Sequence, residues 1–106
     1  MAATAYGRCN RCRRVCRFEC TGKFRVNASR NLIDVWLLFR CLRCRAVVKV
    51  PIVERISVLR IPRQDLEAYR DNDASMASRL QADVAVLRKV GLRRPSDGAQ
   101  CSNAHQ

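Results

Sequence analysis

The sequence predicts an α+β fold, in which a small antiparallel sheet is followed by two C-terminal helices. Three observations predict it. Residues 14–61 are rich in alternating and β-branched stretches, two Cys-x-x-Cys pairs enclose the first of these stretches, and a helical pattern begins at Pro62. We expect one domain, with an Arg-rich β region over residues 1–60, a helical region packed on it over residues 61–91, and a flexible tail over residues 92–106.

The strand signals lie between residues 14 and 61, whereas residues 1–8 carry no clear pattern and are expected to fray. Short strands are expected at 14–18 and 23–27, separated by a turn at 28–31 from a third strand at 32–40. This third strand has apolar side chains on both faces, so we expect it to be central and covered on both sides, with core packing favoured for Trp36. A fourth, β-branched segment follows Cys44, and Pro51 confines it to an edge or a bulge.

Two helices are expected after the strands. The first begins at Pro62, which suits a first helical position, and acidic residues occupy its first turn. The second covers residues 73–90, with Asn72 or Asp73 as N-cap and Gly91 as C-cap. Its apolar stripe has helical spacing and consists of Met76, Leu80, Val84 and Leu87.

The cysteines carry the strongest chemical signal. Cys9 and Cys12 form one Cys-x-x-Cys pair, and Cys41 and Cys44 form a second. A structural zinc ion takes four such thiolates in a tetrahedron, and the tight turn within each pair aims both sulfur atoms at one ion. The sequence between the pairs has the strand, turn and strand of a hairpin, so the pattern predicts a zinc ribbon with these four ligands.

The remaining cysteines fit the site less well. The run from Cys9 through Cys16 to Cys20 does not match ferredoxin spacings, and an iron–sulfur cluster there would leave Cys41 and Cys44 without a role. We interpret Cys16 as a spare or substitute ligand and Cys20 as a small buried residue. Cys101, in the predicted tail, is interpreted as a free thiol. A redox sensor using Cys16, Cys20 or Cys101 stays open, because neighbouring arginines favour thiolate.

Positive charge is concentrated in the β region. The chain has a formal net charge of +12, and residues 1–60 hold 14 basic but only 3 acidic side chains. Seven arginines close to the cysteine pairs are candidates for gripping phosphates: Arg8, Arg11, Arg13, Arg14, Arg17, Arg43 and Arg45. A four-thiolate zinc site carries net negative charge, but two cations balance it, which leaves a surplus for bidentate phosphate contacts. Trp36 and Tyr6 are candidates for stacking on bases.

The stretch "CTGKFRVNASRNLIDVWLLFRCLRC", residues 20–44, resembles a bacterial family known only as a domain of unknown function. Its members are similar in having an N-terminal Cys-x-x-Cys, a phrase like "GKFRVNA…LIDVWL", and a second Cys-x-x-Cys. The resemblance continues through "NDASMASRLQADVAVLRKVG" at residues 72–91. It implies a small cytosolic zinc-ribbon protein with Cys9, Cys12, Cys41 and Cys44 as ligands, and it implies no activity.

Catalysis and membrane insertion have little support. The only histidine, His105, lies in the predicted tail, no glycine-rich phosphate loop is present, and a four-thiolate zinc has no open position for a substrate. No secretory leader is evident, and the apolar run at 32–39 is too short to span a bilayer. We therefore expect a cytoplasmic protein that is not an enzyme and has no small-molecule substrate.

The favoured function is a zinc-binding protein that grips nucleic acid, with RNA or the ribosome favoured over DNA because the expected long helix is nearly neutral. One alternative is a structural adaptor, in which helix 73–90 or the edge strand at 46–50 docks an acidic protein partner. Another is a DNA-binding transcriptional regulator. Arginines gathered at the cysteine pairs favour nucleic acid, whereas arginines scattered over the fold favour the adaptor.

Overall fold

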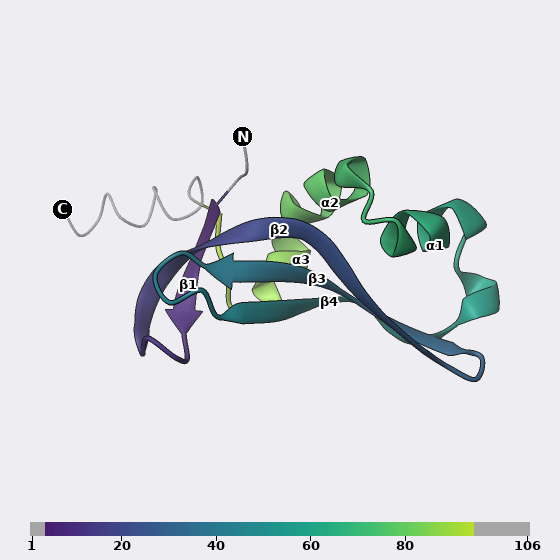
Figure 1. Ribbon diagram of the computed structural model, residues 1–106, viewed down its shortest axis with the longest axis horizontal. Helices are drawn as coiled ribbons and strands as arrows, with labels where there is room; N and C mark the ends of the chain where they lie inside the picture. Colours follow the sequence, from purple (N-terminus) through teal and green to yellow (C-terminus); the bar gives the residue numbers. More distant parts are fainter. Residues whose placement is uncertain (1–3, 95–106) are drawn as a thin grey trace.

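The protein forms a four-stranded antiparallel sheet followed by helices, as seen in the computed structural model, which describes residues 4–94 (Figure 1). The strands lie side by side in chain order, and each pairs with the next. Their bounds are β1 Thr4–Cys9, β2 Arg14–Ser29, β3 Leu32–Cys41 and β4 Val47–Ser57. The predicted α+β class is confirmed, and Pro51 does lie in an edge strand, β4.

Three α-helices follow the sheet where two were expected. A 3₁₀ turn at Val58–Arg60 leads into α1 Arg63–Arg70, α2 Ala74–Gln81 and α3 Val84–Arg88. The single helix predicted over 73–90 is wrong, because Asp83 has an extended backbone and its side chain accepts a hydrogen bond from the N–H of Ala85, which starts a new helix. None of the described helices is long and apolar enough to cross a bilayer.

The ordered structure extends further than predicted at both ends of the fold. Residues 4–8, which were expected to fray, belong to β1, and this strand pairs with the first part of β2. Residues 91–93 pass against β1, where the N–H of Tyr6 donates to the carbonyl of Arg93 at 2.7 Å and the N–H of Arg93 donates back at 2.8 Å. A Cβ on Gly7 would lie 2.7 Å from Leu92 Cδ2, so only glycine permits this approach. Leu92 is buried, and residues 95–106 of the predicted tail lie outside the described residues.

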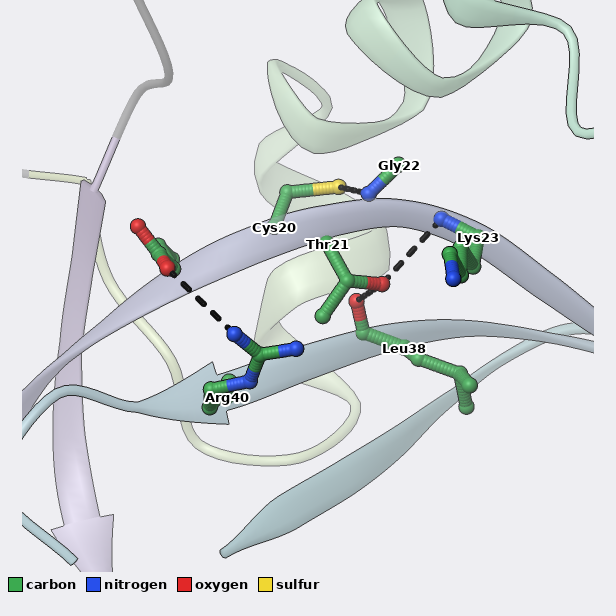
Figure 2. Close-up of polar contacts among 7 residues, drawn as sticks. Cys20, Thr21, Gly22, Lys23, Leu38 and Arg40 are labelled. Atoms are coloured by element: carbon green, nitrogen blue, oxygen red, sulfur yellow. Dashed lines mark hydrogen bonds and ion pairs between the residues drawn. The ribbon is translucent and has the colours of Figure 1, made fainter. Parts of the chain in front are cut away.

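The two strands predicted at 14–18 and 23–27 are one long strand, β2, interrupted by a bulge between Cys20 and Phe24. At the bulge Gly22 has a φ of +77°, and the Thr21 hydroxyl donates to the carbonyl of Leu38 on β3 at 2.9 Å (Figure 2). Next to it, the N–H of Phe24 donates to Asn72 Oδ1 at 2.7 Å. The bulge therefore bends β2 while keeping it attached to β3 and to the α1–α2 junction.

The sheet has one face packed on the helices and one that is not. The core face carries buried residues of β2, β3 and β4 under Tyr69, Met76, Val86 and Leu87 of the helices. Among the described residues, the side chains that alternate with these do not belong to the hydrophobic core. We call this second side the open face; the residues used below are Tyr6, Arg17, Glu19, Arg25, Asp34, Trp36, Leu38, Arg40, Val47 and Lys49.

The expectation that β3 is covered on both sides is wrong, and so is core packing for Trp36. β3 is central within the sheet, as predicted, but every helix residue in the core packs with the side of Ile33 and Leu37. Strand alternation turns Trp36 to the opposite side, where it is half-buried beside Lys49. The apolar pattern of β3 thus reflects two different surroundings.

Candidate metal centre

The sheet brings the two Cys-x-x-Cys turns to the same end of the molecule. β1 and β3 pair with opposite edges of β2 and run in the same direction, so their last residues, Cys9 and Cys41, lie at one end. Cys12 and Cys44 lie in the turns that follow. In Figure 1 these turns are at the left, away from α1. The N–H of Leu42 donates a hydrogen bond of 2.9 Å to the carbonyl of Arg17, which holds the second turn against β2.

The four sulfur atoms have the spacing of a tetrahedral metal site. All lie within 4.8 Å of one another. Cys9 Sγ is 3.6 Å from Cys44 Sγ, and Cys12 Sγ is 4.0 Å from Cys41 Sγ. Thiolates bound at about 2.3 Å in a tetrahedron are about 3.8 Å apart, so the observed distances fit an ion at the centre. The four predicted ligands can therefore hold a metal ion together.

The two turns share one backbone conformation. The N–H of Arg13 donates to the carbonyl of Cys9 at 2.7 Å, and the N–H of Arg45 donates to the carbonyl of Cys41 at 2.9 Å. Both arginines follow the second cysteine of their pair and have left-handed backbones, with φ of 60° and 69°. Glycine adopts this conformation without steric cost, whereas arginine does not. Two arginines thus occupy equivalent, strained positions beside the sulfur cluster.

Backbone N–H groups prepare the first cysteine of each pair as a thiolate. Burial raises the pKa of Cys41, but N–H groups of Cys44 and Arg43, together with the neighbouring thiols of Cys44 and Cys9, outweigh this and lower it to about 6. The pKa of Cys9 is also lowered, chiefly by the N–H of Cys12, which lies 3.4 Å from Cys9 Sγ. In contrast, burial raises the pKa of Cys12, which lies among the other thiols. A bound cation would take the place of the protons that these crowded thiols share.

Cys16 lies beside the cluster without belonging to the set of four. It is buried on β2, and its thiol interacts with those of Cys12 and Cys41. Burial is the largest influence on Cys16 and raises its pKa, which reduces the thiolate fraction. This position fits a substitute ligand better than it fits an activated redox thiol. Cys101 and His105 lie outside the described residues.

Cys20 does not belong to the cluster of four cysteines and has different surroundings. Its side chain lies on the helix-facing side of β2, where its sulfur accepts a hydrogen bond from the N–H of Gly22 at 3.4 Å (Figure 2). It lines a hollow of about 470 Å³ that also includes Lys23, Asn72 and Gln81. Burial raises the pKa of Cys20, which favours the neutral thiol. The expectation that neighbouring arginines favour a Cys20 thiolate is therefore not supported.

Three predicted phosphate-binding arginines line one hollow beside the metal centre. Arg14, Arg17 and Arg43 surround a space of about 330 Å³ whose apolar lining includes Val15 and Leu42. The second turn approaches β2 here, which brings together residues distant in the sequence. We call this the arginine hollow. The remaining candidates, Arg8, Arg11, Arg13 and Arg45, are exposed on β1 or on the two turns.

Residues 26–99 match the family described as "Protein of unknown function (DUF1062)". The chain belongs to this family. The match confirms the resemblance to a family of unknown function, and it includes Cys41 and Cys44. It begins after Cys9 and Cys12, so in this DUF1062 protein it is the tertiary structure that joins those two cysteines to the second pair. No curated protein and no solved structure matches the chain.

Proposed function

We propose that this DUF1062 protein is a zinc-ribbon protein that binds nucleic acid through the arginines at its metal end. The arginine hollow carries the proposal, because three guanidinium groups around one space can hold phosphate oxygens bidentately. Zinc is the ion that a closed set of four thiolates suits best. Such an ion has no open coordination position, which favours a binding role over catalysis.

Charge around the hollow supports an anionic ligand. The described residues contain two ion pairs, Arg40 with Glu19 and Arg63 with Glu67, and neither involves the arginines of the hollow. Arg13 and Arg45 add charge on the adjacent turns. Guanidinium groups that are not neutralised by carboxylates attract phosphate from a distance and hold it on contact.

RNA is favoured over duplex DNA as the ligand. The basic residues of the metal end lie on strands and turns, whereas duplex DNA is most often entered by a helix that carries its own cations. α1 and α2 lie over the core face, and α2 carries a single arginine, Arg79. We place the protein in the cytoplasm, where the thiols needed for the metal stay reduced.

A salt series with matched variants tests the proposal. Affinity for an RNA hairpin and for a DNA duplex is measured by fluorescence anisotropy against salt concentration. The hollow variant is Arg14→Gln/Arg17→Gln/Arg43→Gln. Its control removes the same charge from exposed positions next to or on the helices: Arg60→Gln/Arg70→Gln/Arg88→Gln.

The two variants have distinct expected results. The hollow variant should bind more weakly and lower the slope of log affinity against log salt by about 2–3, since each lost phosphate contact removes roughly 0.7–0.9. The control should lose less affinity at every salt concentration. Equal losses of affinity in both variants would show that binding depends on net charge and not on the arginine hollow. Absence of binding by the parent protein at moderate salt would refute the proposal.

A further inference from the structure

The open face places the protein's only tryptophan on a surface with the composition of a base-stacking platform. Trp36 lies opposite Arg25 on β2 and Pro51 on β4, and Lys49 Nζ is 5.0 Å from the centre of its ring. Leu38 and Trp36 are half-buried although no core residue lies on this side of β3. An aromatic ring and an apolar neighbour are therefore presented between cations.

The open face is continuous with the arginine hollow. Arg17 belongs to both, and Leu42, which lines the hollow, follows directly after Cys41, the last residue of β3. Trp36 and Leu42 are six positions apart in the chain, which corresponds to about 20 Å of extended backbone. Tyr6 adds a second aromatic side chain at the hollow end, because it pairs with Arg17 in the β1–β2 register. This surface thus carries an aromatic ring beside a cation at each of its two ends, Tyr6 with Arg17 and Trp36 with Lys49.

Charge complementarity identifies an anionic occupant. Arg17, Arg25 and Lys49 are exposed on this face. Two carboxylates on this face have local partners: Glu19 lies 4.0 Å from Arg40, and Asp34 accepts a hydrogen bond from the N–H of Arg55 at 2.9 Å. Val47 is 54% exposed, so apolar surface remains available between the cations. A ligand that fits must combine regular negative charge with flat apolar groups.

We infer that the open face binds single-stranded nucleic acid, with an unpaired base stacked on Trp36 and the backbone running to the arginine hollow. The inference rests on the proposed function and names its ligand class. In a duplex the bases are stacked on one another and cannot lie on the ring, whereas unpaired bases can. A base can displace the Lys49 ammonium group from the Trp36 ring, because a cation–π contact at an exposed site is weaker than base–aromatic stacking.

Trp36 is itself the probe, because its fluorescence reports on its ring alone. An oligouridine of about eight nucleotides suits a single-strand platform. It should quench the fluorescence, whereas polyphosphate, which has charge but no bases, should bind the hollow with little quenching. Trp36→Leu should weaken oligouridine binding roughly ten- to hundredfold and leave polyphosphate binding unchanged. Trp36→Phe, which keeps a flat ring, should restore most of the affinity.

Several outcomes would overturn the inference. Equal oligouridine affinity for the parent protein and Trp36→Leu would show that no base stacks there. Concentration-dependent dimerisation that shields Trp36 from an added quencher would assign the face to a second copy of the chain. Binding of duplex and polyphosphate without involvement of Trp36 would remove this inference but leave the proposed function standing, whereas no salt-dependent binding of any nucleic acid would remove both. If Trp36→Leu does not fold, the inference is tested by oligouridine quenching of the parent protein's fluorescence and by the oligouridine affinity of Trp36→Phe.

Discussion

Replacing Arg13 and Arg45 by glycine should make the protein more stable and at the same time weaker in binding. Both arginines have left-handed backbones, with φ of 60° and 69°. For a residue with a Cβ this conformation costs about 1–2 kcal/mol. Glycine removes that cost but adds roughly 0.4–1 kcal/mol of entropy to the unfolded chain. The net gain is about 0.5–1 kcal/mol at each position.

The assay is thermal unfolding followed by circular dichroism on zinc-loaded protein at a fixed free zinc concentration. A gain of about 1 kcal/mol raises Tm by about 4–8 °C in a domain of this size, so the double variant should exceed that of the parent by at least several degrees. Arg30→Gly is the matched control. Its φ of 59° is equivalent, but it lies in the turn between β2 and β3, outside the two Cys-x-x-Cys turns.

The comparison separates strain from function. Arg30→Gly should raise Tm without changing affinity for an RNA hairpin, whereas Arg13→Gly/Arg45→Gly should raise Tm and bind more weakly, because two cations are lost beside the arginine hollow. A lower or unchanged Tm in both variants would refute the strain argument. Undiminished RNA affinity in the double variant would show that the strained arginines are not used for binding.

Three other perturbations test the metal centre and the chain ends. Cys44→Ser should lose the metal and the cooperative unfolding transition, because metal binding and folding are coupled; a folded, zinc-free variant would contradict the ribbon. Acidification should release zinc to a chromogenic chelator, because protons compete with the ion for the thiolates, and a bound ion keeps them deprotonated to lower pH than in the metal-free protein, where the pKa of Cys41 is already lowered; zinc that stays bound in strong acid would contradict thiolate ligands. Gly7→Ala should destabilise the protein by about 1–3 kcal/mol in urea unfolding, because its Cβ meets Leu92 and the Gly91 carbonyl; an unchanged midpoint would contradict that packing.

Local features were predictable where the chemistry lies within a few residues. The spacing of Cys9 and Cys12 specifies a turn that aims two sulfur atoms together, and Cys41 and Cys44 repeat it. The alternation over 32–40 predicted β3, because period-two patterning is a property of neighbouring residues. The helix predicted over 73–90 failed for a local reason as well. Asp83 is a poor interior residue but a good N-cap, and its capping role outweighed the apolar stripe.

By itself, the sequence determined the ligand chemistry, the central strand, the order of sheet and helices, and the concentration of arginine near the cysteines. The tertiary structure alone decided that β1 exists and that the two cysteine pairs meet across β2. It alone decided that Arg14, Arg17 and Arg43 share a hollow. It also decided that Trp36 lies on the open face, although its strand is apolar on both sides. The physical reason is range: spacing and period act between neighbours, whereas strand register and the choice of the covered face depend on contacts between distant segments.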